Sequence, residues 1–378
     1  MNPPLLRFAP IFSLIALLGA ACQSADHPGD RGSTQVLESD AVARLLERPE
    51  CLEDFSPSSG AWVVEGLTVE SKGILLSGQL YLPTRGDRWP LVILVPGGFN
   101  EADLIMQAPR YYAPRLATCG IAAYVYWKRG TGPSGGVYAE ATYDDFADDI
   151  ISIARHFVAH PKIDSLKIGV YGGSAGGLLG PLAAVRSEEI SFVISSSGPI
   201  VPTEEENNYN IENALRVRGY ADSLVEKVMP LWRRHHAAWA QNDTAAHGAV
   251  AAEVYELRKQ YDPRMLPTPY QEVFADSELI FLWPVFRSAH RDYMSELKGL
   301  KARWLSVYGE DDAIVPVTSC VRNIEALARE GEDRRYDIIV LPDVNHSFVN
   351  PEKRTQVPVI RILINWIQAV VKHPEEQL

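Results

Sequence analysis

The sequence predicts an α/β fold with a mostly parallel sheet, and three observations support this expectation. Short apolar runs alternate with longer amphipathic stretches, as they do when parallel strands are joined by crossover helices. The run Leu91–Val95 lies between Pro90 and Pro96 and shows no polar alternation, which is typical of a strand buried on both faces. The 378 residues are 46% hydrophobic, which is enough apolar material for a large core.

The expected elements follow one another along the chain with turn residues between them. Two strand-like stretches, Trp62–Val69 and Gly73–Leu82, precede the buried strand. The alternating pattern comes next and ends near Pro202. It consists of the strand Ile121–Tyr126, the helix Tyr143–His160, the strand Ile168–Tyr171, the helix Ala175–Arg186 and the strand Phe192–Ser196.

An insertion interrupts the alternation after residue 202. No strand signal of comparable strength occurs up to about Tyr293, and aromatic residues recur among Glu, Arg and Ala with helical spacing. We therefore expect core residues 60–202, a helical cap at 203–294 and a second core segment at 295–378. The second segment contains the strand Trp304–Val307, the helix Pro316–Arg329, the strand Tyr336–Leu341 and a final helix from about Lys353 to Val370.

The amino terminus has the pattern of an export signal. Arg7 is the only charged residue before Asp26, and the apolar run Phe8–Ala21 ends in small residues. This run is shorter than the roughly 20 residues that a membrane-spanning helix needs. The residues before Cys22 also resemble a bacterial lipoprotein box, so cleavage of a signal peptide at 1–21 and lipid attachment at Cys22 both remain open. Either outcome predicts an exported protein, periplasmic or anchored to a membrane as a lipoprotein.

The segment after the signal is polar, and we expect residues 22–59 to form a tether with a short helix at Ser39–Glu47. Without the signal segment the chain has three cysteines, Cys51, Cys119 and Cys320. An odd number allows at most one disulfide, so the chain is not a disulfide scaffold. Cys119 lies beside an apolar run and fits a small core residue.

A glycine-flanked serine is the candidate nucleophile. Gly172-Gly173-Ser174-Ala175-Gly176 lies between a short apolar strand and a helical pattern. A serine at such a turn takes strained backbone angles, and the residues two before and two after it must lack bulk. The turn raises the hydroxyl above the sheet at a helix amino terminus, where N–H groups can stabilise an oxyanion. A phosphate-binding loop needs a different spacing, which the sequence does not have.

With this motif in its strand and helix context, the chain resembles the α/β-hydrolase superfamily over roughly residues 63–201 and 302–370. The resemblance implies a mostly parallel eight-stranded sheet flanked by helices, with the insertion as a helical cap. It also implies a catalytic triad in the order Ser, acid, His. Ser174 would attack a carbonyl carbon and form an acyl-enzyme, which water then hydrolyses.

The other two members of the triad follow from the same resemblance. Residues 309–316 resemble the acid loop of the family, with Asp312 at the acid position. Asp311 is the competing acid, because a shift of the loop by one residue would exchange the two. His346 lies in a loop after the strand Tyr336–Leu341, where the family has its histidine. Of the nine histidines, it alone follows an expected strand of the sheet.

The resemblance places the oxyanion hole at two backbone segments. One N–H would come from Ala175, and the second from the loop Pro96-Gly97-Gly98-Phe99 after the buried strand. Gly98 has the better register for this second donor, and Phe99 remains the alternative.

The expected activity is hydrolysis of carboxylic esters of small or medium substrates, with thioester or amide bonds also open. The first alternative is a peptidase or amidase of the acyl-peptidase-like kind, and the second is a catalytically silent hydrolase fold that acts as a binding protein. No metal or cofactor is expected. The net charge of −12 argues against nucleic acid as a partner, which leaves a small-molecule ester or acyl substrate. The oligomeric state stays open.

Overall fold

The structure is a computed structural model of the chain. The expected export signal at 1–21 and Cys22 lie outside the residues that it describes. In the described part of the chain, no helix is both long enough and apolar enough to cross a bilayer. The described residues are 33–98, 106–217, 219–241, 243–260, 288–289, 291–330 and 335–372.

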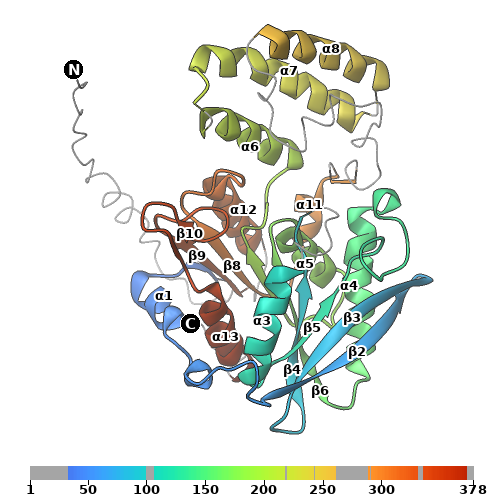
Figure 1. Ribbon diagram of the computed structural model, residues 1–378, viewed down its shortest axis with the longest axis vertical. Coiled ribbons are helices and arrows are strands. Elements are labelled where there is room, and N and C mark those ends of the chain that lie inside the picture. Colours follow the sequence, from blue (N-terminus) through green and yellow to red (C-terminus); the bar gives the residue numbers. More distant parts are fainter. Residues whose placement is uncertain are drawn as a thin grey trace. The chain divides into compact units, whose positions relative to one another are not determined.

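A mostly parallel sheet of nine strands organises these residues (Figure 1). Its strand order is β1-β9-β8-β7-β6-β4-β5-β3-β2, and the antiparallel pairs are β5 with β3 and β3 with β2. The α/β-hydrolase fold expected from the sequence is thereby confirmed. The bounds are β1 Ser33–Val36, β2 Trp62–Ser71, β3 Ile74–Pro83, β4 Trp89–Val95, β5 Ala122–Tyr126, β6 Ile163–Gly173, β7 Phe192–Ser196, β8 Arg303–Gly309 and β9 Arg335–Leu341.

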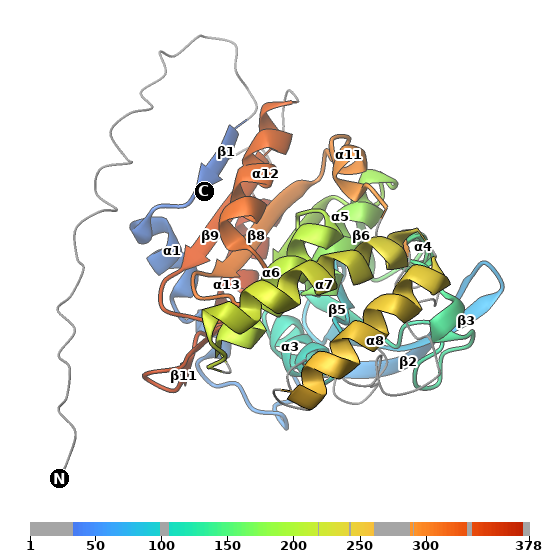
Figure 2. The same ribbon diagram turned by 90° about the horizontal axis from the view of Figure 1, so that it is seen from above.

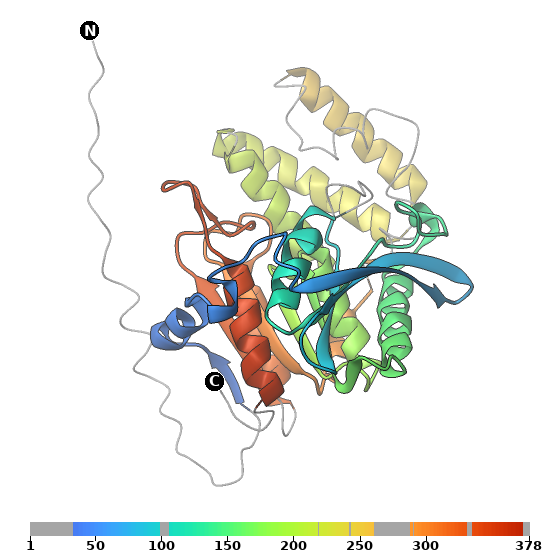
Figure 3. The same ribbon diagram turned by 60° about the horizontal axis from the view of Figure 1, so that its bottom comes forward.

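The central strands are buried on both faces, so their side chains alternate between two hydrophobic cores. Leu91 and Ile93 of β4 belong to one core, and Val92 and Leu94 belong to the other. This arrangement explains why β4 is a continuous apolar run in the sequence. Helices α4 (Tyr143–Val158), α5 (Ala175–Val185) and α12 (Val317–Arg329) contribute to the first core. Helices α3 (Gln107–Thr118) and α13 (Val359–Lys372) contribute to the second, and Figure 3 shows them side by side on one face of the sheet.

Residues 33–55 pack onto the core, so the expectation of a polar tether at 22–59 was wrong for them. Strand β1 pairs in parallel with β9 and is the ninth strand of a sheet for which eight were expected. Helix α1 (Ser39–Leu46) packs against α13, and a disulfide joins Cys51 to Cys119. A short strand at the edge of a sheet is held mainly by backbone hydrogen bonds to a partner that is distant in the sequence. The residue pattern of the strand itself therefore cannot predict the pairing.

The final helix also begins later than expected, at Val359 and not at Lys353. Two short strands, β10 (Val349–Asn350) and β11 (Thr355–Gln356), form a hairpin before the helix, and β11 occupies part of the segment that was expected to be helical. Pro358 directly precedes the helix, and the ring of a proline keeps the residue before it extended. The helix therefore cannot continue back through Val357.

The described part of the insertion is helical. It contains α6 (Thr203–Val217), α7 (Asp222–Ala240) and α8 (Thr244–Gln260), while residues 261–287 lie outside the described residues. Figures 1 and 2 show these three helices grouped beyond the sheet, on the side where the parallel strands have their carboxyl ends. They share a small core of their own, made of Ile211, Leu215, Leu224, Val225, Val228, Met229, Leu231, Trp232 and Val250.

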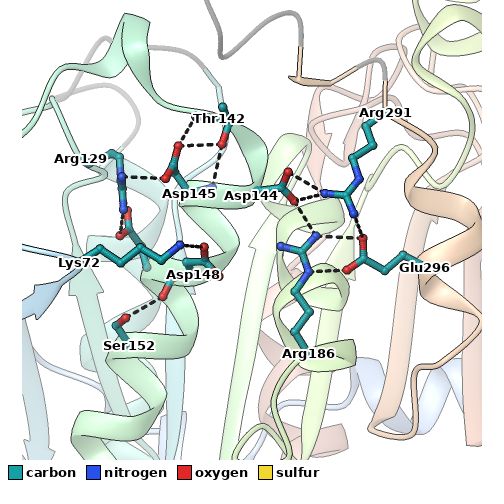
Figure 4. A network of polar contacts seen from close by, with 11 residues as sticks. Lys72, Arg129, Thr142, Asp144, Asp145, Asp148, Ser152, Arg186, Arg291 and Glu296 are labelled. Carbon is teal, nitrogen blue, oxygen red and sulfur yellow. Dashed lines mark hydrogen bonds and ion pairs between the residues drawn. The ribbon is translucent and has the colours of Figure 1, made fainter.

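A network of ion pairs fixes the chain where it returns from the insertion (Figure 4). Asp144 of α4 lies 2.7 Å from both Arg186 and Arg291. Glu296, in the short helix α11 (Tyr293–Leu297), lies 2.5 Å from Arg186 and 3.1 Å from Arg291. Isolated surface pairs contribute little to stability, but here two carboxylates share two guanidinium groups. The network therefore ties α11 to α4 and α5.

Candidate active site

Ser174 occupies a sharp turn between β6 and α5, with φ of 52° and ψ of −125°. Such angles are strained for a residue with a side chain, at a cost of about 1–3 kcal/mol. The two flanking glycines make the turn possible. A β-carbon on Gly172 would lie 2.1 Å from the carbonyl oxygen of Gly176, and one on Gly176 would lie 2.9 Å from that of Val95. These close backbone contacts therefore require glycine at both positions.

His346 and Asp312 form a hydrogen-bonded pair. The Nδ1 atom of His346 lies 2.8 Å from Oδ2 of Asp312. The other carboxylate oxygen of Asp312 accepts the backbone N–H groups of Ile314 and Val315, each at 2.9 Å. Asp312 is 1% exposed, whereas the competing Asp311 is exposed to solvent. In the neutral tautomer whose Nδ1–H donates to this carboxylate, the lone pair of the imidazole lies on Nε2.

Close backbone packing holds the acid loop against the histidine loop. The N–H of Asp311 donates to the carbonyl oxygen of Val344 at 3.0 Å. A β-carbon on Gly309 would lie 2.4 Å from the same oxygen, so a larger residue there would separate the two loops. The Asp312 and His346 side chains are thus positioned by contacts between main chains.

The end of β7 connects the serine turn to the histidine loop. The N–H of Ser174 donates to the carbonyl oxygen of Ser196 at 2.8 Å. The next residue, Ser197, donates from its hydroxyl to the carbonyl oxygen of His346 at 3.1 Å. The candidate nucleophile and the candidate base are therefore anchored to consecutive residues of one strand end.

The loop after β4 approaches the serine turn from the other side. A β-carbon on Gly97 would lie 2.7 Å from the carbonyl oxygen of Gly173 and 3.6 Å from Cβ of Ser174. Gly98 has a φ of 63°, and Ala175 is the first residue of α5, where backbone N–H groups have no acceptor within the helix. The structure therefore brings the Gly97-Gly98 segment next to Ser174 and Ala175. Phe99 lies outside the described residues.

Helix α6 of the cap contacts the acid loop, which the sequence analysis did not anticipate. The hydroxyl of Tyr209 donates to the carbonyl oxygen of Asp312 at 2.9 Å, and the side-chain amide of Asn213 donates to that of Ala313 at 3.2 Å. Burial raises the pKa of Glu206, in the same helix, to about 7; the neighbouring His346 opposes this shift and Asp312 adds to it.

Three successive glutamates at the start of α6 gave no signal for this placement. They fit the preference for acidic residues in the first turn of a helix, and the sequence does not indicate which one lies near His346 and Asp312.

Arg129, in the loop after β5, has a structural role. Its guanidinium donates to both oxygens of Asp149, at 2.8 and 2.5 Å, and lies 3.1 Å from Asp145 (Figure 4). Both carboxylates belong to α4, so the arginine fixes that helix to the end of the sheet.

Within the described residues, no group of three His, Cys, Asp or Glu side chains is arranged to hold a metal ion.

Solved structures with the same fold include several hydrolases. The α/β hydrolase GrgF from Penicillium sp. sh18 aligns with a TM-score of 0.52 and 14% identity over 82% of this chain and 99% of that one. An esterase from Pyrococcus furiosus aligns with a TM-score of 0.50 and 14% identity over 92% and 97% of the two chains. The dipeptidyl peptidase 4 of Porphyromonas gingivalis has a TM-score of 0.52 and 15% identity, and covers 82% of this chain and 35% of that one. Likeness at these identities concerns the fold alone.

Sequence comparison is more specific. The polyketide transferase claH of Penicillium crustosum is 28% identical over 192 residues, which are 49% of this chain and 61% of that protein's length. The model of the X-Pro dipeptidyl-peptidase (S15) family matches residues 72–347, a range that includes Ser174, Asp312 and His346. This match covers well over half of the chain. The chain therefore belongs to the X-Pro dipeptidyl-peptidase (S15) family and has the α/β-hydrolase fold.

Proposed function

We propose that the protein is a serine hydrolase that cleaves carboxylic esters through an acyl-enzyme on Ser174. The 2.8 Å contact between Nδ1 of His346 and Oδ2 of Asp312 carries this proposal. A buried carboxylate paired with a histidine, together with a strained, glycine-flanked serine anchored to the same strand end, is the set of groups that can activate a hydroxyl for attack on a carbonyl carbon.

Each residue has a distinct task in the proposed mechanism. Nε2 of His346 takes the proton of Ser174 as its oxygen attacks the carbonyl carbon, and Asp312 stabilises the imidazolium that results. The N–H groups of Ala175 and Gly98 stabilise the oxyanion. The imidazolium then returns the proton to the leaving group. A water molecule releases the acid in a second round of the same steps.

The backbone hydrogen bonds to Asp312 matter for this mechanism. Ile314 and Val315 hold one oxygen of the carboxylate, so that the other oxygen faces Nδ1. The carboxylate is thereby oriented to stabilise positive charge on His346.

Peptide hydrolysis is the second candidate, and family membership favours it. The family takes its name from the removal of X-Pro dipeptides, and acyl transfer from an amide uses the same groups as acyl transfer from an ester. The two candidates differ in the leaving group and in what the cap must recognise.

A fluorophosphonate probe tests the proposed nucleophile. We expect the probe to modify Ser174, as read by mass spectrometry of the digested protein, and we expect Ser174→Ala and His346→Ala to abolish ester turnover. Ser347→Ala, a change at an exposed neighbour of the histidine, is the matched control and should keep full activity. A folded protein in which Ser174 stays unmodified would support the silent binding protein instead.

A substrate panel separates the two hydrolytic candidates. Esters of graded acyl length and X-Pro dipeptide amides are compared by kcat/KM on the same preparation. We expect the short and medium esters to be the better substrates. If X-Pro amides exceed every ester by tenfold or more, the peptidase assignment replaces the esterase assignment.

We further propose that the chain is exported. The disulfide between Cys51 and Cys119 supports this, because disulfides persist mainly in oxidising compartments such as the periplasm. The intact mass of the protein from cell fractions tests the proposal: a mature chain that starts near residue 22, with or without lipid, is expected. A full-length chain in the cytosol with free thiols would refute it.

A further inference from the structure

Lys128 is a buried lysine next to the proposed oxyanion hole. It follows β5, the parallel neighbour of β4, and therefore lies beside the loop that follows β4. The residue is 3% exposed. Its Nζ atom lies 3.4 Å from the carbonyl oxygen of Gly98 and 5.2 Å from the centre of the Phe146 ring.

The placement of this amine has a cost in stability. Burial lowers the pKa of Lys128 to about 7, because the charged form loses its hydration. A methionine of similar length would fill the same space without this penalty. Both the ammonium and the neutral amine carry N–H groups, so the hydrogen bond to Gly98 persists on either side of pH 7. The cost and the persistence of the contact together favour a functional role for the side chain.

The loop that Lys128 contacts needs an external restraint. Gly97 and Gly98 have no side chains to hold them, and glycine adopts a wide range of backbone angles. One side of the loop rests against Gly173 of the serine turn. Lys128 holds the other side, and its own backbone is fixed by Thr131, which donates its N–H and its hydroxyl to the Lys128 carbonyl oxygen at 3.0 and 2.8 Å.

We propose that Lys128 is a positioning residue for the oxyanion hole, which holds the Gly98 carbonyl oxygen and thereby keeps the N–H of Gly98 aimed at the oxyanion. The inference rests on the proposed function. Lys128 acts through Gly98, and its effect belongs to the transition state, because the oxyanion exists only there. Loss of the lysine should therefore lower kcat and leave KM nearly unchanged.

Lys128→Met tests the inference, with Lys301→Met at an exposed lysine as the matched control. For a short ester, we expect kcat to fall about 10- to 100-fold and KM to stay within about twofold, a smaller loss than the removal of a donor causes. Affinity for a trifluoromethyl ketone, which forms an oxyanion with the serine, should fall by a similar factor. The midpoint of thermal unfolding should stay the same or rise, because a buried amine is removed. Lys301→Met should leave all four quantities unchanged.

Two results would overturn the inference. One is a kcat within threefold of the unmodified protein. The other is a parallel fall of kcat and unfolding midpoint with unchanged affinity for the ketone, which would indicate a structural role. If Lys128→Met does not fold, Lys128→Gln decides by the same measurements, since it keeps a shorter N–H donor and should retain an intermediate kcat. Failure of the probe to label Ser174 in the unmodified protein would refute the proposed function itself, independently of Lys128.

Discussion

The loops of the core that carry the candidate triad and the helices of the cap are held in different ways. Asp312 is fully buried, and its two carboxylate oxygens take part in three hydrogen bonds. The serine turn and the acid loop also depend on glycines at which a β-carbon would clash with backbone atoms. The cap helices instead pack around a small core of their own. Among the described cap residues, those of α6 donate hydrogen bonds to the acid loop.

This difference follows from what each region must do. Acyl transfer requires the reacting groups to be held within about 0.5 Å of the productive geometry, which main-chain contacts achieve better than side chains alone. Substrate recognition needs a surface whose shape can change without disturbance of those groups. A helical unit with its own core, joined to the acid loop through one helix, meets that need.

The largest effect is expected inside the core, at the acid. Asp312→Asn should lower kcat by about 10⁴-fold, because the amide no longer holds the histidine in the correct tautomer or stabilises its cation. The exposed Asp311 provides the matched control, and Asp311→Asn should stay within about threefold. Steady-state ester hydrolysis measures both. Equal losses in the two variants would mean that the acid loop moves by one residue during catalysis.

The next effect concerns the amino-terminal segment and changes stability without changing chemistry. Replacement of both Cys51 and Cys119 by serine should lower the free energy of unfolding by about 2–5 kcal/mol. The value of kcat at low temperature should stay within about twofold, because neither residue contacts the site. Denaturant unfolding gives the first quantity and ester hydrolysis the second. The unmodified protein under reducing conditions should behave like the variant, and a stability that does not respond to reductant would contradict the prediction.

The smallest effect is expected from the cap, at Glu206. The carboxyl group ionises near pH 7, and only its charged form favours the imidazolium of the transition state. The rate at pH 8 should therefore fall about 2- to 10-fold in Glu206→Gln, with no change at pH 6. The pH profile of kcat measures this, and Glu204→Gln on the exposed side of α6 is the control. A loss of the same size at both pH values would rule out an electrostatic role.

Stability provides a second readout at Glu206, with a defined sign. Because its pKa is raised from 4.5 to about 7 in the folded state, ionisation of this carboxyl opposes folding. The stability that the protonated group provides is fully present below about pH 4.5 and is lost as the pH rises through 7. Glu206→Gln should therefore gain stability relative to the unmodified protein over that interval. A constant difference across the interval would contradict the raised pKa.

Candidate site residues can be predicted from the sequence where their structural requirement involves only neighbouring residues. Gly172 and Gly176 had to be small because the turn at Ser174 brings them into contact. The five consecutive residues of this turn are enough to predict that requirement. Asp312 was favoured over Asp311 only by resemblance, and its burial and hydrogen bonds distinguish the two in the structure. Glu206 and Lys128 were not predicted, because each acquires its importance from a neighbour far away in the sequence.

By itself, the sequence determined the α/β architecture, the serine turn and the position of the insertion, since strand burial, helix periodicity and tight turns depend on neighbouring residues. Tertiary structure alone decided that residues 33–55 join the core, that Cys51 pairs with Cys119, and that α6 lies against the acid loop. These features come from pairings between distant segments, whose free energy depends on the shape and backbone groups of the partner. The local residue pattern of a segment therefore does not predict which distant segment it will pair with.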